Sequence, residues 1–292
     1  MAFNFSVFRV RALSAIVFAF IMISGLLWNE WSFFTLFMII GLGCLYEFQK
    51  LIRLISPGYK QISLVHQWGL LLLCVAIMMA LSSTTLMIQY IPLRLIGIRT
   101  VPVIIVILLL GDVFTKKGSL QNWASSFMGL IYIPMGLSLF FQLKGLPISN
   151  EYPQWGFMIP LIIIATVWIN DTMAYIAGSI IGRTPLSSIS PNKTWEGTIA
   201  GVILAVIIVT FLSGWVNKYY FPHLENTKQV FIICLTAAIA GNFGDLMESK
   251  LKRMAGVKDS GNMMPGHGGF LDRFDSILFA GPFVWLIVQF LY

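Results

Sequence analysis

Charged residues are scarce in this chain of 292 residues. Only 11% of the residues are Asp, Glu, Lys or Arg, whereas 58% are hydrophobic and the mean hydropathy is +0.83. An ordinary soluble domain is about 25% charged, so this composition cannot cover the surface of one. The scarcity of charge therefore excludes a cytosolic domain, a disordered protein and a nucleic-acid-binding protein, and it leaves a polytopic membrane protein.

Cysteine is scarce as well, and its spacing carries no pattern. The three residues Cys44, Cys74 and Cys234 all lie inside apolar runs. Their odd number and wide separation predict neither a disulfide framework nor a cysteine-based metal site. We interpret them as small packing residues.

Long apolar runs, in contrast, are abundant. A helix needs roughly 20 residues to cross the hydrocarbon core, and backbone groups in lipid must be paired within the segment. We therefore predict an all-α polytopic membrane protein with about nine transmembrane helices in a single domain, 1–292. The predicted spans are 12–28, 31–48, 64–82, 100–114, 124–142, 157–180, 197–215, 229–247 and 274–291.

The distribution of basic residues predicts how the helices are oriented in the membrane. With nine spans, most of the 19 Lys and Arg residues fall on one side, which includes the loops 181–197 and 248–275. The positive-inside rule places that side in the cytoplasm. The excess of Lys and Arg over the 12 Asp and Glu residues also predicts contacts with anionic lipids.

The first polar segment lies around Asp171 and the loop that follows it. A carboxylate inside an apolar run is costly unless it is paired or faces water, so we interpret Asp171 as a wall of a polar cavity, with a helix–helix hydrogen bond as the alternative. Downstream, Ser190, Lys193 and Thr194 carry groups that suit phosphate oxygens near a helix N-terminus. Pro191 fits the first turn of that helix. A capped helix start that binds nothing explains the same residues equally well.

The second polar segment, 244–275, is richer in charge. Asp245, Glu248, Ser249 and Lys252 are spaced to share one face of a helix. Asp272 and Asp275 are spaced to share a face at the start of the last span. Two such helix ends could hold Mg²⁺, which takes one or two carboxylates together with substrate phosphates. The alternative is a solvated loop at the membrane surface in contact with anionic lipid.

A basic, glycine-rich loop connects these two helix ends. Its glycines allow positive φ angles and close approach of the backbone, and successive N–H groups in such a loop can point at phosphate. His267 could act as a ligand or as an acid or base, although a hydrogen-bonding loop residue is the more common outcome. Of the other polar residues, we assign no partner to His66 or His223, and we attribute Glu47 and Asp112 to the ends of their spans.

These segments resemble the signature of phosphatidate cytidylyltransferases, the CDP-diacylglycerol synthases. The resemblance rests on residues 249–253, 258–261 and 265–275, and the stretches 170–175 and 190–197 are also similar to family segments. Met264 stands where the family usually has Leu, Ile or Phe, and Asn192 where Lys is common. The resemblance covers roughly the C-terminal 45% of the chain, so we expect catalytic helices over 157–292 and variable helices over 1–150 that match in hydropathy alone.

The resemblance implies transfer of the cytidylyl group of CTP to phosphatidate with Mg²⁺, which gives CDP-diacylglycerol and pyrophosphate for phospholipid biosynthesis. It also implies a homodimer whose active site faces the cytoplasm, and the short chain suits a bacterial plasma membrane. By the motif, Asp245 and Asp272 hold the metal, and we add Asp275; a second, monovalent cation is left open. The predicted catalytic residues are Asp245, Asp272, Lys252, Arg253, Lys258 and Arg273. The predicted substrate-binding residues are Ser190, Lys193, Thr194, Glu196, Asp171, Ser249, His267, Gly268 and Gly269.

Two other functions are compatible with parts of this pattern. A CTP-dependent polyprenol or phytol kinase would transfer the γ-phosphate to a lipid alcohol, but the full signature argues against it. A membrane transporter would use its intramembrane Asp residues to carry ions. Transporters often show internal repeats and broken helices in both halves, whereas the charges of this chain gather in the C-terminal half and on one side.

Overall fold

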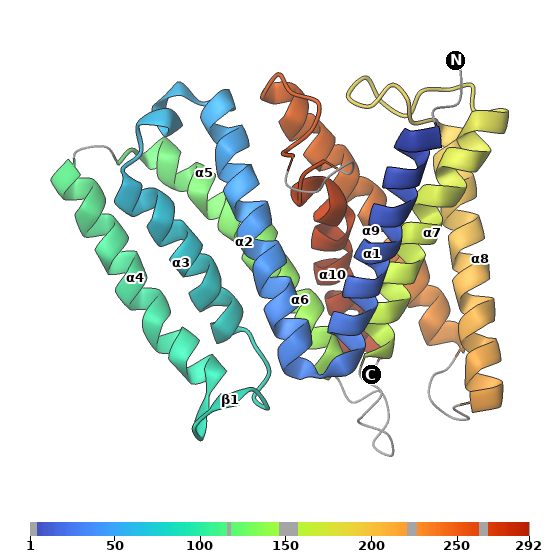
Figure 1. Ribbon diagram of the computed structural model, residues 1–292, viewed down its shortest axis with the longest axis horizontal. Coiled ribbons are helices and arrows are strands. Elements are labelled where there is room, and N and C mark those ends of the chain that lie inside the picture. Colours follow the sequence, from blue (N-terminus) through green and yellow to red (C-terminus); the bar gives the residue numbers. More distant parts are fainter. Residues whose placement is uncertain (1–4, 116–117, 146–156, 221–226, 263–267, 292) are drawn as a thin grey trace. The chain divides into compact units, whose positions relative to one another are not determined.

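The computed structural model is helical almost throughout (Figure 1). It describes residues 5–115, 118–145, 157–220, 227–262 and 268–291. Within these ranges the extended structure consists of one antiparallel hairpin, β1 (Met87–Ile88) and β2 (Ile91–Pro92), and an isolated bridge between Pro185 and Thr194. The chain divides into two compact units, which we describe separately.

The first unit comprises residues 1–134 and 254–274. Its helices begin with α1 (Phe5–Trp28) and α2 (Glu30–Ile55), where Asn29 and Ser32 form a capping box between the two. The 3-10 helix η1 (Pro57–Gln61), α3 (Leu64–Ala80), the hairpin, α4 (Leu93–Thr115) and α5 (Leu120–Leu130) follow. Residues 254–274 return to this unit from far along the sequence.

The second unit comprises residues 135–253 and 275–292. The π-helical turn η2 (Ile131–Met135) continues α5 into α6 (Gly136–Gln142), and the 3-10 turn η3 (Leu143–Gly145) follows. The remaining helices are α7 (Met158–Ile181), α8 (Trp195–Tyr220), α9 (Thr227–Met254) and α10 (Leu271–Leu291).

The apolar runs of the sequence correspond to apolar helices. Within the described residues, seven helices are long and apolar enough to cross a membrane, and two shorter apolar helices cover 16–28 and 64–80. The prediction of an all-α polytopic membrane fold is confirmed, while the count of nine spans stays a prediction. The fourth predicted span, 100–114, proved too short: α4 covers Leu93–Thr115 and contains Pro102.

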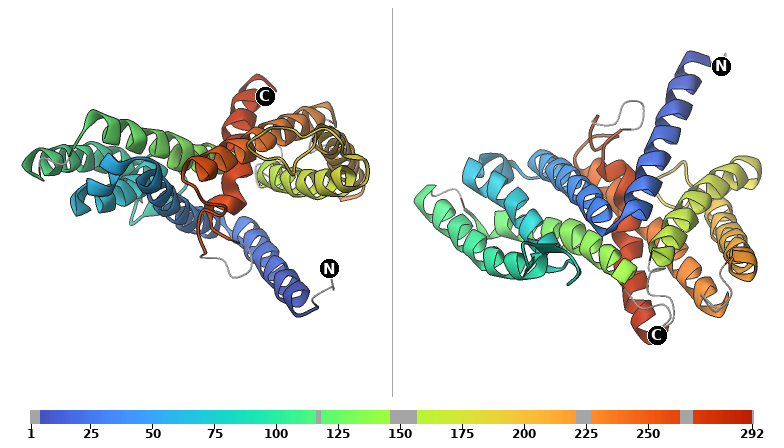
Figure 2. Two further views of the ribbon diagram at one scale, coloured as in Figure 1. Left: turned by 90° about the horizontal axis from the view of Figure 1, so that it is seen from above. Right: turned by 60° about the horizontal axis from the view of Figure 1, so that its bottom comes forward.

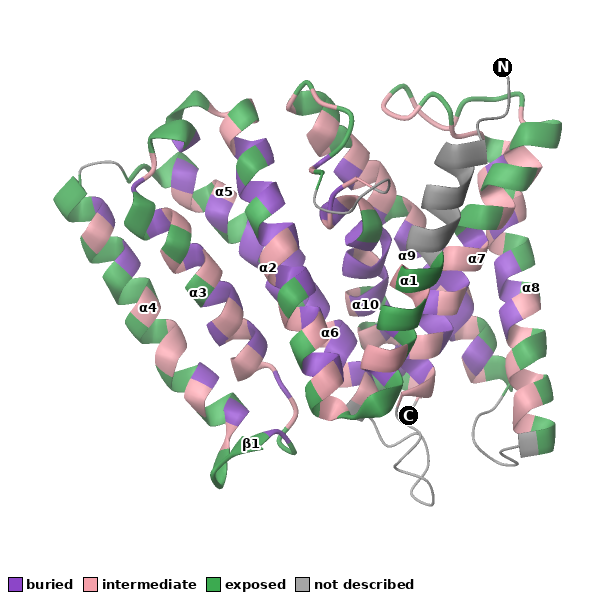
Figure 3. Cartoon of the chain, in the orientation of Figure 1, coloured by how far each residue is buried: buried purple, intermediate pink, exposed green. Residues whose placement is uncertain are grey.

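Small residues allow α7 and α8 to pack closely, and the two helices lie side by side in Figures 1 and 2. A Cβ atom added at Gly201 would lie 2.8 Å from the main-chain oxygen of Asn170, and one at Gly197 would lie 2.7 Å from that of Ala174. Because lipid gives helices no hydrophobic reason to associate, such close backbone packing is what holds membrane helices together. Exposed apolar residues are frequent along α4 and α8, as in lipid-facing helices, and Figure 3 shows many exposed residues on both helices.

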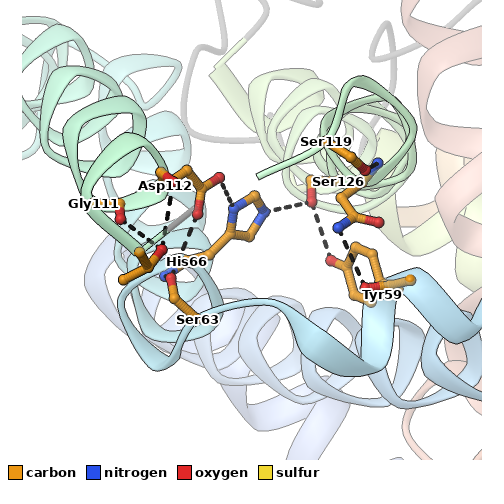
Figure 4. Close-up of polar contacts among 10 residues, drawn as sticks. Tyr59, Ser63, His66, Gly111, Asp112, Ser119 and Ser126 are labelled. Atoms are coloured by element: carbon orange, nitrogen blue, oxygen red, sulfur yellow. Dashed lines mark hydrogen bonds and ion pairs between the residues drawn. The ribbon is translucent and has the colours of Figure 1, made fainter. Parts of the chain in front are cut away.

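A buried polar network joins the helices of the first unit, and it corrects the expectation that His66 has no polar partner (Figure 4). The His66 ring Nδ1 lies 2.6 Å from Asp112 Oδ2, and its Nε2 lies 2.9 Å from Ser126 Oγ. Ser126 Oγ also lies 3.1 Å from the Tyr59 hydroxyl, and Ser63 donates to Asp112 Oδ1 at 3.4 Å. Asp112 is thus a buried partner of His66, and its position at the end of a span does not explain it.

Burial decides what this Ser–His–Asp arrangement can do. His66, Asp112 and Ser126 are 0%, 5% and 2% exposed, so the serine oxygen cannot meet a substrate. Burial also raises the pKa of Tyr59, which keeps its phenol protonated and able to hydrogen-bond. The network satisfies polar groups that would otherwise be unpaired between α3, α4 and α5. It stabilises the unit and offers no nucleophile.

The network predicts a specific pattern of destabilisation. His66→Leu should lower the free energy of unfolding by about 3–5 kcal/mol, because Asp112 is left buried without its partner. The double variant His66→Leu/Asp112→Leu should lose less than the single variant, because no unpaired carboxylate remains. Thermal unfolding of both variants in detergent measures the difference. A double variant less stable than His66→Leu would contradict this account of the network.

Candidate functional site

Helix α9 carries the polar face that its residue spacing predicts. Asp245, Glu248 and Lys252 lie within the single helix Thr227–Met254. Glu248 is 0% exposed and forms an ion pair with Lys252 one turn later. Ser249 Oγ lies 3.5 Å from Asp245 Oδ1. The C-terminal end of α9 therefore presents carboxylates and a cation within a largely apolar helix.

Asp275 of α10 joins the carboxylates of α9. One oxygen each from Asp245, Glu248 and Asp275 lies within 4.8 Å of the others. Gly244 makes this possible: an added Cβ would meet the main-chain oxygen of Asp275, so a larger residue would separate the two helices. The sequence analysis placed Glu248 on the polar face but did not include it in the carboxylate group. Three carboxylate oxygens this close together are the donors that a hard cation such as Mg²⁺ prefers.

Lys193 reaches this group from the loop between α7 and α8. Its ammonium forms an ion pair with Asp245. Burial lowers the pKa of Lys193, and the negative charges of Asp171 and Asp275 oppose that shift. The loop is held by hydrogen bonds from Leu186 N to Lys193 O at 2.7 Å and from Lys193 N to Ser190 O at 3.1 Å. Cations and carboxylates thus converge from three elements of the second unit.

The start of α8 differs from the prediction. The helix begins at Trp195, and Thr194 caps it by accepting a hydrogen bond from Gly197 N at 3.2 Å. Pro191 lies in the preceding turn, so its assignment to the first helical turn is wrong. The reason is the bridge between Pro185 and Thr194, which keeps the chain extended up to the cap. Glu196 accepts main-chain hydrogen bonds from 183–184 at 3.2 Å, which closes the loop onto the helix; its substrate-binding role stays a prediction.

A pair of asparagines links α7 to α9 beside the carboxylates. The side-chain amides of Asn170 and Asn242 exchange hydrogen bonds at 3.4 Å, and Asn242 also donates to Ala238 O at 2.8 Å. Asn170 donates to Asp171 Oδ1 at 3.3 Å as well. Asp171 is exposed, and its place in the wall of a polar cavity stays a prediction. The sequence analysis did not single out Asn242, whose partner lies 72 residues away.

The remaining part of the signature belongs to the first unit. Asp272 Oδ2 accepts hydrogen bonds from Ser260 N and Ser260 Oγ at 3.0 Å and from Gly269 N at 2.8 Å. Gly268 has φ +84°, a conformation that favours glycine. Asp272 thus holds together the loop between α9 and α10, which we call the signature loop, and its role as a metal ligand stays a prediction. Lys258 and Arg273 in this unit, and Arg253 at the end of the second, are exposed.

Two histidines cannot be placed, and one unexpected residue contacts the signature segment in the first unit. His267, predicted to bind substrate, and His223 lie outside the described residues. Glu47 on α2 is 1% exposed and accepts hydrogen bonds from Ser260, Phe270 and Leu271. The explanation that Glu47 merely marks the end of a span is therefore wrong. A lone acid in an apolar helix was the available signal, but its partners lie more than 200 residues away.

Comparison with known proteins extends the similarity over nearly the whole chain. A family model for the cytidylyltransferase family matches residues 9–291. A phosphatidate cytidylyltransferase of Bacillus subtilis is 34% identical over 281 residues, which cover 94% of each chain. Proteins of the same name from Rickettsia bellii and Thermotoga maritima are each 40% identical, over 58% and 56% of this chain and 75% and 58% of their own. The expectation that residues 1–150 match in hydropathy alone is corrected by the range of these matches.

The approach of α9 to α10 predicts a position-specific cost for one methyl group. Gly244→Ala should lower the free energy of unfolding by about 1–3 kcal/mol, because the added Cβ meets backbone that must shift. Gly214→Ala on α8 is the matched control, since its Cβ would meet nothing within 4 Å. That variant should be stabilised by up to about 1 kcal/mol. Thermal unfolding in detergent compares the two, and equal changes would contradict the close packing at Gly244.

Proposed function

Since the chain belongs to the cytidylyltransferase family, we propose that it transfers the cytidylyl group of CTP to phosphatidate, giving CDP-diacylglycerol and pyrophosphate for phospholipid biosynthesis. The observation that carries this proposal is the group of Asp245, Glu248 and Asp275 with the cations Lys193 and Lys252, at the ends of apolar helices. A reaction between a membrane lipid and a water-soluble nucleotide needs such a polar group at the membrane surface.

The chemistry asks for charge stabilisation more than for proton transfer. The second pKa of a phosphate monoester is near 6. Most phosphatidate molecules are therefore dianions at neutral pH, and the reaction needs no general base to activate them. One of its phosphate oxygens forms a bond to the α-phosphorus of CTP, and the bond from that phosphorus to the bridging oxygen of pyrophosphate breaks. Both substrates are polyanions, so cations must offset their repulsion and the charge that develops on the leaving group.

The two lysines of the group suit that task. Lys193 enters from the loop before α8 and Lys252 from α9, so they approach the carboxylates from different elements. We propose that both bind phosphate oxygens, together with Arg253, Lys258 and Arg273. Ser190, Thr194, Ser249 and the backbone at 268–269 would add neutral donors.

The carboxylates fit Mg²⁺. Their oxygens lie within 4.8 Å of one another, and Mg²⁺ is usually held by few carboxylates together with substrate phosphates. We propose that Asp245, Glu248 and Asp275 hold it, with Asp272 as the further ligand that the family motif implies. Bound Mg²⁺ would neutralise phosphate charge and orient the leaving pyrophosphate. Asp171 is exposed and suits a second, monovalent cation.

The cellular setting follows from the same features. The distribution of Lys and Arg favours a site that faces the cytoplasm, where CTP is available. The lipid would enter from the bilayer, and anionic lipids would gather around the basic loops. We propose a homodimer, which the family resemblance implies, and a bacterial plasma membrane as its location.

The position of the transferred label tests the reaction itself. Purified protein in detergent receives phosphatidate, Mg²⁺ and CTP labelled at either the α- or the γ-phosphate. We expect α-label in the lipid and release of pyrophosphate. Label from the γ position in an added lipid alcohol would instead identify a CTP-dependent kinase. Failure to transfer either label, in protein that binds CTP, would contradict the proposal and favour a transporter.

Asp245→Asn tests the carboxylate group. It removes one negative ligand and the partner of Lys193, so turnover should fall by at least about 100-fold, the scale of losing one preorganised electrostatic contact. Glu30→Gln is the control and should retain activity, because this carboxylate lies in the first turn of α2 and accepts a hydrogen bond from Thr85. Monodisperse, folded protein in both variants excludes an effect of misfolding. Near-normal turnover in Asp245→Asn would remove Asp245 from the site.

A further inference from the structure

The buried carboxylate of Glu47 accepts hydrogen bonds from a loop that lies far along the sequence. It lies on α2 inside the first unit, 1% exposed, and its partners are 213 to 224 residues later in the chain. Glu47 Oε1 accepts from Phe270 N at 3.1 Å, and Oε2 accepts from Leu271 N at 2.9 Å and from Ser260 Oγ at 2.8 Å. Two backbone N–H groups, and a hydroxyl that also lies beside Asp272, replace the water that the carboxylate lost on burial. A single side chain thus fixes both ends of the signature loop.

The same loop holds Asp272. Ser260 Oγ lies 3.0 Å from Asp272 Oδ2, so one hydroxyl lies between the two carboxylates. A hydroxyl has one proton, so Ser260 Oγ can donate to only one of the two carboxylates at a time. Each carboxylate also accepts hydrogen bonds from two backbone N–H groups of its own: those of Phe270 and Leu271 for Glu47, and those of Ser260 and Gly269 for Asp272. The orientation of Asp272 therefore depends on backbone that Glu47 holds in place.

The glycines of the signature make room for this carboxylate. A Cβ added at either Gly261 or Gly269 would lie 2.7 Å from Glu47 Cδ and closer still to one of its oxygens. One turn before Glu47, Gly43 lies against the Phe270 ring, where an added Cβ would come within 2.7 Å. Gly43 and Glu47 therefore form one face of α2 that contacts residues 260–261 and 269–271. The loop and the helix fit each other in shape as well as in hydrogen bonding.

We infer that Glu47 is a positioning residue of the proposed reaction: it fixes the signature loop so that Asp272 is oriented before substrate and cation arrive. This inference rests on the proposed function and on the predicted role of Asp272. Partners that orient metal ligands typically contribute 10- to 100-fold to metal affinity or activity. A residue that only stabilised the fold would change the amount of folded protein and leave its specific activity unchanged.

Glu47→Gln is the informative variant, because the amide keeps the shape but offers one acceptor oxygen where three donors converge. We expect kcat to fall by about 10- to 100-fold and half-maximal activity to require more Mg²⁺, with KM for CTP changed less. Gln49→Met is the matched control: Gln49 is equally buried on α2, but it donates to Gln67 O in the neighbouring helix. It should keep its kcat even where its melting temperature falls.

Hydrogen–deuterium exchange supplies a readout that is independent of activity. In protein without Mg²⁺ or CTP, the amides of Gly269, Phe270 and Leu271 should exchange faster in Glu47→Gln than in the parent protein or in Gln49→Met. Glu47→Asp, which restores the charge on a shorter side chain, should recover part of the protection and part of kcat. Unchanged exchange in Glu47→Gln would overturn the inference.

A double variant separates positioning through Asp272 from a general effect. In an Asp272→Asn background, Glu47→Gln should reduce the residual rate much less than it does in the parent protein, because residues that act as a unit are not additive. Equal, independent losses would overturn the inference. The activity of the parent protein tests the proposed function separately. If the parent protein transfers no α-label, the proposed function is contradicted. If the parent protein is active and Glu47→Gln is equally active, only the role of Glu47 is contradicted.

Discussion

A carboxylate can be placed among apolar membrane helices only if specific donors or cations replace its water, and this constraint organises both units. Asp112 meets His66, Glu47 meets the amides of the signature loop, and Asp245 meets Lys193. Each pairing joins segments that apolar packing alone would not bring together in a fixed register. The acids therefore act as the specific contacts of a chain whose composition offers few others.

Glycine is the counterpart of these polar contacts. Hydrogen bonds and ion pairs act over about 3 Å, so the backbones that carry them must approach closely. Gly244 lets α9 reach the start of α10, Gly197 and Gly201 let α8 reach α7, and Gly269 leaves space for the Glu47 carboxylate. In lipid, where apolar side chains gain little by leaving their surroundings, this close approach is itself a source of helix association. Polar function and helix packing thus depend on the same small residues.

Features set by local periodicity could be predicted from the sequence. Apolar run length gave the helices, and the spacing of Asp245, Glu248 and Lys252 gave their common face. What could not be predicted was pairing across the chain: a lone His66 or Glu47 has the same local surroundings whether its partner exists or not. The prediction that Pro191 lies in the first turn of α8 was wrong for a related reason. The bridge at Thr194, which keeps Pro191 outside the helix, is a contact that local sequence does not reveal.

The pairing of lysines with carboxylates affects how substrate and Mg²⁺ would bind at the start of the proposed reaction. Unpaired lysines at a membrane surface would attract anionic lipid without discrimination, and unpaired buried carboxylates would be costly. Pairing Lys193 with Asp245 and Lys252 with Glu248 avoids both. Arriving phosphate groups offer the lysines stronger, multiply charged partners, and each exchange leaves a carboxylate available to a cation that the phosphates also bind. Binding of the nucleotide phosphates to the lysines would then favour binding of Mg²⁺ to the carboxylates, and the reverse would also hold. Each ligand separates the same lysine–carboxylate pairs that the other must separate in order to bind.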